Sequence, residues 1–314
     1  MNYRALPLAL GGLIACVLVT PCRAADADLT VPASALLVAP LAVPESSLLV
    51  PDPTAPSAPP PAAKDDLDLA AGYTLPLAPV GTAAAEAAPL TGNVTLTSEY
   101  AYRGIAQTDH KPALQGCIEY AFANGFYVGN WDSNITWLSD ANARVHAPVE
   151  LDFYGGYRHN LVEGLDYDVG YLEYYYPGGY PVGMNRPDTG EAYGALTFGP
   201  ATLKYSYAIT NLFGFTSPAG DSTRGSGYLD LSIATEVAAG LTAGAHVGHQ
   251  SVAQFGGASY TDYRISLAKD FSGWLVTAAA ITTNARGGPG EPYLGPSGKN
   301  LGAARLIASV GRNF

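Results

Sequence analysis

The sequence predicts an all-β fold, a transmembrane antiparallel β-barrel of about twelve strands. First, residues 91–314 divide into short segments of alternating apolar and polar residues, separated by clusters of Gly, Asn, Asp and Pro. Second, the chain contains 21 Tyr, which suit a lipid–water boundary because their rings need one wet end. Third, without a long apolar helix this region can span lipid only as a closed barrel that pairs every backbone N–H and C=O group.

Residues 1–24 have the features of an export signal. An early cation, Arg4, precedes the apolar run 5–19, and small residues follow up to Ala24. The run is interrupted by Pro and Gly and is shorter than the roughly 20 residues of a transmembrane helix. Cys16 ends a Leu-Ile-Ala-Cys stretch similar to the lipobox of acylated lipoproteins. Because the apolar run continues beyond this cysteine, cleavage near Ala24 is favoured.

Residues 25–90 predict a disordered, Pro/Ala-rich periplasmic tether. The segment has few aromatic residues and no periodic apolar pattern, so it buries too little surface to offset the entropy of ordering. Its leucines near 36–38 and 48–50 could instead dock on a partner, although a plain linker is favoured.

The first barrel strand is predicted over 93–103, because side chains alternate between the two faces of a strand. One face is expected to meet lipid, and it carries Val94, Leu96, Tyr100 and Tyr102. The other face is expected to line the lumen, and it carries Thr95, Thr97, Glu99 and Arg103.

The same alternation continues to the end of the chain. A second strand is predicted over 111–122, and Asn124-Gly125 then gives a strong signal for a two-residue hairpin turn. Further strands are predicted over 126–134, 149–158, 165–176, 189–198, 201–210, 227–237, 241–249, 260–269, 274–283 and 304–314. Short and long links alternate between them, as periplasmic turns and outer loops do, and an even strand number places both termini in the periplasm. A soluble β-sandwich would not explain the export signal and the terminal Phe314 together.

Composition excludes several functional classes. The net charge is -11 and only 14% of residues are charged, so no basic surface for nucleic acid is expected. Cleavage near Ala24 would leave Cys117 as the single thiol, which excludes an internal disulfide or a Cys-rich metal site. No cofactor, metal or catalytic residue is predicted.

Four stretches carry a family resemblance: LTSEYAYRGIAQT at 96–108, PALQG at 112–116, GFYVGNW at 125–131 and ELDFYGGY at 150–157. Together they resemble the Gcw-type family, also called the TorF-type porins. The similarity is dense over 96–157 and diffuse afterwards, and the Pro/Ala-rich segment lies outside it. The resemblance implies an uncharacterised outer-membrane β-barrel protein, described as a porin by analogy, without an established substrate or catalytic residues.

The carboxyl terminus is similar to the outer-membrane assembly signature, in which an aromatic final residue follows apolar residues at alternate positions. Leu306, Ala308, Val310 and Phe314 fit this signature, which implies recognition of Phe314 by the barrel assembly machinery. Arg312 departs from the pattern, but a long arginine near the interface can extend its charge toward lipid head groups.

Charged residues on the inward-facing positions predict the character of the lumen. They are Glu99, Arg103, Lys111, Glu119, Glu150, Asp152, Arg158, Asp166, Asp168, Lys204, Asp230, Glu236, Asp262, Arg264 and Arg305. Carboxylates outnumber cations in this set, which predicts a mild preference for cations. Selectivity at the mouth is expected from loop residues, namely Asp109, Lys111, Asp140 and Arg144.

Two pairs of residues raise the question of a metal or catalytic site. Glu150 and Asp152 could form a cation site or an acid–base pair, but pairing with Arg158 or Arg103 is the favoured interpretation. His246 and His249 have opposite strand parity, so they are not expected to chelate one metal together.

The favoured function is passive diffusion of small hydrophilic solutes through a porin in the outer membrane of a Gram-negative bacterium. One alternative is a barrel whose lumen is filled by paired side chains, because twelve strands lie between filled and open barrels. Another is a phospholipase-like enzyme that uses Ser232 and His246, although no Gly-x-Ser-x-Gly motif occurs and both side chains are predicted to face the lumen. A third is a binding or adhesin role, which would need long ordered loops.

Overall fold

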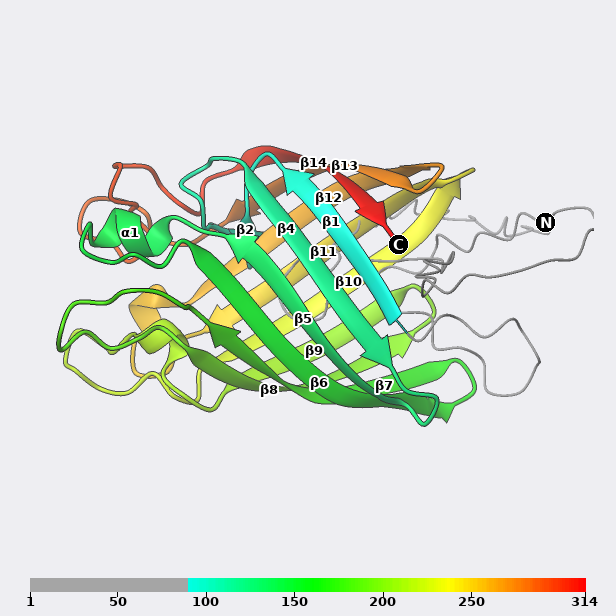
Figure 1. Cartoon of the computed structure of the whole chain (residues 1–314), viewed down its shortest axis with the longest axis horizontal. Helices are drawn as coiled ribbons and strands as arrows, with labels where there is room; N and C mark the ends of the chain where they lie inside the picture. The colour runs from blue at the N-terminus through cyan, green and yellow to red at the C-terminus, as the bar shows by residue number, and fades with distance from the viewer. Residues whose placement is uncertain (1–89) are drawn as a thin grey trace, which may run out of the picture.

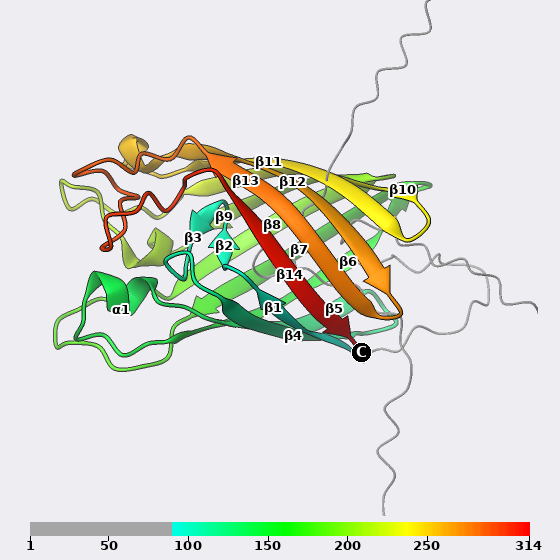
Figure 2. The same cartoon turned by 90° about the horizontal axis from the view of Figure 1, so that it is seen from above.

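The computed structural model describes residues 90–314, which form a closed antiparallel barrel of twelve strands (Figure 1, Figure 2). The strands are β1 (Leu90–Thr97), β4 (Ala113–Ala121), β5 (Phe126–Asn134), β6 (Val149–Val162), β7 (Leu165–Tyr175), β8 (Thr189–Phe198), β9 (Ala201–Ala208), β10 (Gly227–Ala238), β11 (Leu241–Ser251), β12 (Tyr260–Phe271), β13 (Trp274–Thr283) and β14 (Arg305–Asn313). Each strand pairs with its neighbour in sequence, and β1 pairs with both β4 and β14. The predicted fold is confirmed, whereas the predicted export signal, the Cys16 lipobox and the tether lie outside the described residues.

Short turns join the strands at one end of the barrel, here called the turn end, and longer loops join them at the loop end (Figure 1). Three short helices belong to these loops: α1 (Trp137–Ala141), η1 (Leu212–Gly214) and η2 (Gly256–Ala258). In the described part of the chain, none of the helices is long and apolar enough to cross a bilayer.

Side chains on the barrel strands alternate between an apolar outer surface and a mixed inner wall. On β4, Leu114 and Ile118 point outward and are 59% and 46% exposed, whereas Cys117 and Glu119, on either side of Ile118, are buried. The barrel closes where the backbone N–H and C=O groups of Gly92 and Phe314 bond each other at 2.8 and 3.0 Å. The strands therefore leave no open edge between β1 and β14.

Arg312, which departs from the assembly signature, lies at the turn end. Its guanidinium donates to the Ser272 carbonyl at 2.8 Å and lies 5.5 Å from the centre of the Trp274 ring. A cation held beside an exposed aromatic ring fits the expected interface position.

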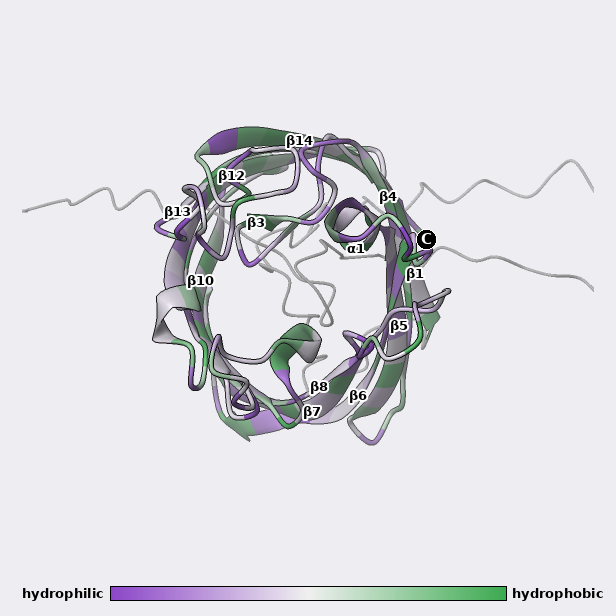
Figure 3. Ribbon diagram, turned by 90° about the vertical axis from the view of Figure 1, so that its left-hand side faces the viewer, coloured by the Kyte–Doolittle hydropathy of each residue, from purple (hydrophilic) through white to green (hydrophobic). Residues whose placement is uncertain are grey.

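The first predicted strand is corrected by the structure. Strand β1 ends at Thr97, and residues 98–112 turn into the barrel, where β2 (Ala101–Tyr102) and β3 (Ile105–Ala106) pair (Figure 3). We call residues 98–112 the inward hairpin. Tyr100 and Tyr102 are 2% and 6% exposed, so their predicted contact with lipid is wrong.

One side of the lumen is filled with aromatic rings. Tyr100 and Tyr102 join a buried cluster with Trp131, Tyr154 and Tyr174 from β5, β6 and β7. Glycines on adjacent strands make room for such rings, because a Cβ atom at Gly129 would collide with Tyr154 and one at Gly156 with Tyr127. Tyr100 and Tyr102 of the inward hairpin thus pack on rings of β5–β7, while the Arg103-Gly104 turn at its tip approaches β12 and β13.

Candidate functional site

The tip of the inward hairpin is a tight turn against the barrel wall. Arg103 and Gly104 have φ values of 46° and 77°, as a two-residue turn with two left-handed residues requires. A Cβ atom at Gly104 would lie 2.5 Å from Cγ2 of Thr283 and 2.8 Å from Cβ of Asp262. Only glycine therefore lets the tip approach β12 and β13 this closely.

Arg103 anchors the hairpin to the far wall. Its Nη1 and Nη2 donate to Oε1 and Oε2 of Glu191 on β8 at 3.1 and 2.7 Å, and Nη1 also donates to Oε1 of Gln250 on β11 at 2.8 Å. The guanidinium lies 4.7 Å from the Tyr102 ring centre and 4.2 Å from that of Tyr228. The ion pair is buried, with Arg103 and Glu191 side chains 5% and 2% exposed. Bidentate geometry makes this the strongest type of carboxylate contact.

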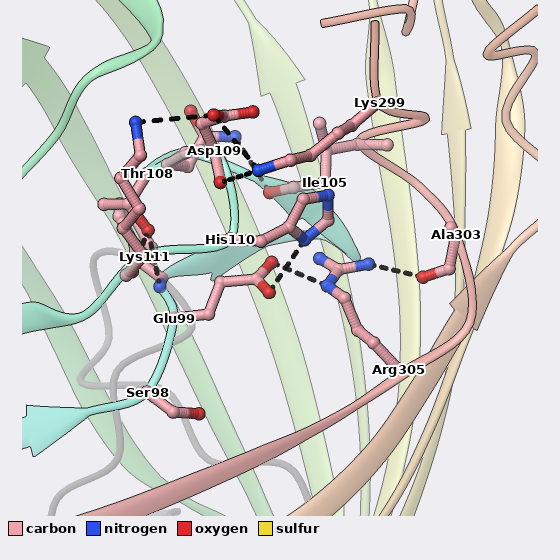
Figure 4. A network of polar contacts seen from close by, with 12 residues as sticks. Ser98, Glu99, Ile105, Thr108, Asp109, His110, Lys111, Lys299, Ala303 and Arg305 are labelled. Carbon is pink, nitrogen blue, oxygen red and sulfur yellow. Dashed lines mark hydrogen bonds and ion pairs between the residues drawn. The ribbon is translucent and has the colours of Figure 1, made fainter. Parts of the chain in front are cut away.

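Glu99 holds the base of the hairpin (Figure 4). Its Oε1 accepts from Nε of Arg305 on β14 at 2.6 Å, and its Oε2 lies 2.9 Å from Nδ1 of His110. Arg305 also donates to the Gly104 carbonyl at 3.1 Å. Glu99 and Arg103 thus lie inside the barrel, on the hairpin rather than on a wall strand.

Asp109 ties the hairpin to the loop 284–304 (Figure 4). Its carboxylate accepts from Ser297 Oγ at 2.5 Å and from Lys299 Nζ at 3.3 Å, and it lies 3.4 Å from Lys111 Nζ. Burial raises the pKa of Asp109, but hydrogen bonds from these three groups outweigh it and hold that pKa below its usual range. Lys111 is 56% exposed at the mouth, so its predicted lumen position is wrong.

The other two residues predicted at the mouth, Asp140 and Arg144, are exposed in the loop 135–148.

Glu150 and Asp152 lie on the inner wall of β6 but not in the predicted ion pairs. Glu150 accepts a hydrogen bond from the Tyr100 hydroxyl at 3.0 Å. Asp152 is fully buried, and its two carboxylate oxygens accept no hydrogen bond from residues 90–314. Arg158, one expected partner, instead pairs with Glu119. The predicted pairing failed because Arg158 lies six residues beyond Asp152 on β6, toward the turn end, where its side chain reaches Glu119 of β4.

A second charged cluster lies on β10, β11 and β12. His246 Nδ1 lies 2.6 Å from Asp230 Oδ2, and His246 Nε2 lies 2.7 Å from Asp262 Oδ2. Ser232 pairs with His246 in the β10–β11 register, yet its hydroxyl donates to Asp230 at 2.5 Å. With both imidazole nitrogens facing carboxylates, this arrangement does not present a base to Ser232. His249 is exposed on the outer face.

The remaining predicted residues lie at several depths. Asp168 accepts from the Tyr127 hydroxyl at 2.6 Å, and Lys204 Nζ lies 4.4 Å from the centre of the Tyr193 ring. Asp166 accepts from Asn160 at 2.9 Å near the turn end. Glu236 has the same strand parity as Asp230 and pairs with Thr242, but it is exposed at the turn end, where it accepts from the Gly240 N–H at 2.7 Å.

A polar cavity of about 60 Å³ lies beside the hairpin, between its base and the β11–β14 wall. Glu99 and Gly104 border it on the hairpin side, and Asp262, Arg264 and Thr277 border it on the wall side. Its volume is enough for a few water molecules.

Sequence reasoning missed Glu191 and Gln250, the partners of Arg103. Glu191 is a carboxylate on the correctly predicted strand 189–198, with the same parity as the buried Tyr193. That parity was the available signal for an inward position.

Residues 81–314 match the model of a family described as a bacterial protein of unknown function (Gcw_chp). No curated protein matches the chain.

Three solved structures are among those to which the chain is similar. The chain is 10% identical to the KdgM porin, with 71% of this chain and 98% of that chain covered and a TM-score of 0.45. It is 10% identical to the NanC porin, with 72% and 98% covered and a TM-score of 0.45. It is 12% identical to the outer membrane protein OprD from Pseudomonas aeruginosa, with 72% and 65% covered and a TM-score of 0.33.

Proposed function

The chain belongs to the Gcw_chp family of bacterial proteins of unknown function, and from this premise we propose that it is an outer-membrane channel for small hydrophilic solutes. The observation that carries the proposal is the closed barrel with an apolar outer surface and a charged inner wall. Such a wall is costly unless water or a polar solute shares the lumen. Lipid would contact the outer surface, and the turn end would face the periplasm.

The proposed passage runs through the polar cavity beside the inward hairpin. The hairpin lies inside the ring of strands (Figure 3), and the cavity beside it measures only about 60 Å³, so the route is narrow and low conductance is expected. Export by the signal and insertion by the barrel assembly machinery through Phe314 complete the proposal.

Cation preference is proposed to follow from the excess of carboxylates over cations on the inner wall as a whole. Glu99, Glu119 and Glu191 each pair with an arginine, which cancels much of their field. Glu150 and Asp152 have no ion pair with Lys or Arg within the described chain, but both are buried and neither borders the polar cavity. A buried carboxyl without a cation favours its neutral form, so these two add little to the preference.

Planar-bilayer recordings under a KCl gradient test both points. The wild type should give ohmic steps and a reversal potential that favours potassium. The double variant Asp152→Asn, Asp168→Asn should shift the reversal potential toward zero, whereas the matched control Asp140→Asn in an exposed loop should not. A protein that is inserted but silent at all voltages would contradict the channel proposal.

Silence would favour a second candidate, a structural barrel closed by its hairpin. The buried Arg103–Glu191 pair is the specific observation in its favour. We further propose that the protein is not an enzyme. Turnover of dispersed phospholipid that disappears in Ser232→Ala would contradict this.

A further inference from the structure

A second, larger cavity opens among the loops beyond the inward hairpin. Its volume is about 340 Å³, and we call it the vestibule. The hairpin and the loops of the loop end converge on it, through residues that include Tyr102, Ile105, Trp137, Phe213, Phe255 and Tyr293. This volume falls within the range of small-molecule sites, which is roughly 300–1,000 Å³.

The chemistry of the vestibule differs from that of the lumen below. No Asp, Glu, Lys or Arg borders it within residues 90–314, and its surface is mainly aromatic and aliphatic. A charged ligand would lose hydration without gaining a counter-charge, and a sugar would leave most of its hydroxyls unpaired. A flat ring, in contrast, gains contact area and favourable stacking with aromatic side chains.

The aromatic rings are held in fixed orientations. Trp137 packs edge-on against Tyr176, with ring centres 5.6 Å apart and planes at 88°. Tyr260 and Tyr293 pack at 5.0 Å and 74°, and the Tyr293 hydroxyl donates to the Ala258 carbonyl at 2.5 Å. A cavity built from rings that already contact each other loses little side-chain entropy when a ligand binds.

Backbone geometry supports a specific role for Phe213. Its φ of 48° and ψ of 37° place a bulky residue in the left-handed region, and its N–H bonds Thr189 Oγ1 at 2.7 Å. Such strained residues cluster at binding sites. Here the strain places the Phe213 ring against Tyr102, with centres 5.4 Å apart, at the vestibule.

Two side chains at the vestibule, Gln107 and Trp137, have a polar atom that no hydrogen bond within residues 90–314 occupies, and the Gln107 oxygen is the acceptor of the two. Gln250 is engaged, since its amide oxygen accepts from Arg103 and its amide nitrogen donates to Gly227. Gln107 donates to the Ile105 carbonyl at 3.0 Å, but no donor in the described chain bonds its amide oxygen. This oxygen can accept one hydrogen bond from a hydroxyl or amino group.

We propose that the vestibule binds a small, uncharged molecule that has a planar ring and one hydroxyl or amino donor. The ring lies among the aromatic side chains, and the donor bonds Gln107. The site goes beyond the proposed channel function, because binding here does not require that any solute crosses the barrel.

Naphthol is the probe, titrated into the full chain in lipid nanodiscs while tryptophan fluorescence is followed. Wild type should give saturable quenching, because Trp137 borders the vestibule. Phe255→Ala should weaken binding roughly tenfold, and Ala258→Trp, which fills the cavity, should abolish it. The matched control is Trp274→Phe, an exposed outer-surface position at the turn end, and it should retain the wild-type affinity.

Two comparisons test the ligand class. Naphthalenesulfonate, which has the same ring and a negative charge, should bind at least about tenfold more weakly, and glucose should not compete. Naphthalene should bind more weakly than naphthol in the wild type but equally in Gln107→Leu.

Quenching that never saturates, or that is unchanged in Ala258→Trp, would overturn the proposal, as would tighter binding of naphthalenesulfonate or competition by glucose. Because the titration involves no voltage, a silent bilayer recording would leave this result intact and contradict only the channel.

Discussion

Removing Arg103 should release the inward hairpin. Arg103→Ala deletes two hydrogen bonds to Glu191, of 3.1 and 2.7 Å, and leaves a carboxylate that is 2% exposed without its cation. Breaking one side of a buried ion pair costs about 3–5 kcal/mol, mainly because the remaining charge is uncompensated.

The barrel can relieve that penalty without unfolding. If the hairpin leaves its position, Glu191 regains water, while the backbone pairing of the strands is unchanged. Each 1.4 kcal/mol changes a population tenfold, so the open fraction should rise roughly a hundredfold to a few thousandfold. Conductance should therefore increase, whereas resistance of the barrel to denaturant should change little.

Cys117 reports on the opening directly. It is 8% exposed on the inner wall of β4 and belongs to the same buried cluster as Tyr100 of the hairpin. With Cys16 and Cys22 changed to Ser, Cys117 is the single thiol of the chain. Its reaction with a water-soluble methanethiosulfonate should be at least roughly a hundredfold faster in Arg103→Ala.

Two controls define the cause. Arg144→Ala, an exposed loop position, should react at the wild-type rate. Combining Arg103→Met with Glu191→Leu should restore slow modification, since an apolar pair can replace a buried ion pair. An Arg103→Ala rate within about twofold of wild type would refute the reasoning, because the ion pair would then not hold the hairpin.

Two further predictions concern the same segment. Gly104→Ala should speed Cys117 modification because its Cβ would lie 2.5 Å from Thr283. The control is Gly164→Ala, which has the same φ of 77° but no atom nearer than 3.6 Å to its Cβ, and it should not change the rate. Equal effects would mean that the positive φ, and not the contact with Thr283, causes the change. The pKa of Asp109 is lower in the folded protein than in the unfolded chain, where it is about 4. The stabilisation that Asp109 gives to the inward hairpin is therefore fully present above about pH 4, and it is lost as the pH falls through the pKa of the folded state. The conductance of the wild type should therefore rise in acid. The conductance of Asp109→Asn should already be high at neutral pH and should show no such rise in acid. An identical rise in both proteins would contradict the assignment.

The barrel strands were predictable because alternation is imposed by the two solvents, lipid outside and water inside. A residue such as Leu114 has no alternative position once its neighbours on β4 are fixed. Apart from the first strand, which ends six residues before its predicted end, strand ends were correct to a few residues, since Gly and Asn at the turns limit where pairing can continue.

The inward hairpin was not predictable from that pattern. Alternation in 98–103 is the same whether the strand stays in the wall or turns inward, because Tyr100 and Tyr102 suit either an interface or an aromatic core. The distinguishing signal is Arg103-Gly104, a turn with two left-handed residues. Partners such as Glu191 and Gln250 are distant in sequence, so only the closed barrel identifies them.

The hairpin and the barrel are stabilised by different interactions, and this couples the vestibule to the lumen. Strand pairing cannot open in lipid, whereas the ion pairs of the hairpin can exchange for water in the lumen. Tyr102 borders the vestibule and also lies against Arg103, so a bound ring should favour the inward position.

Linkage then requires reciprocity. Naphthol should slow Cys117 modification, and opening of the hairpin should weaken naphthol binding by the same factor by which naphthol lowers the opening equilibrium. Arg103→Ala shifts the hairpin toward the open position, so it should weaken naphthol binding by at most that factor. A Cys117 modification rate unchanged by saturating naphthol would mean that the vestibule and the hairpin act independently.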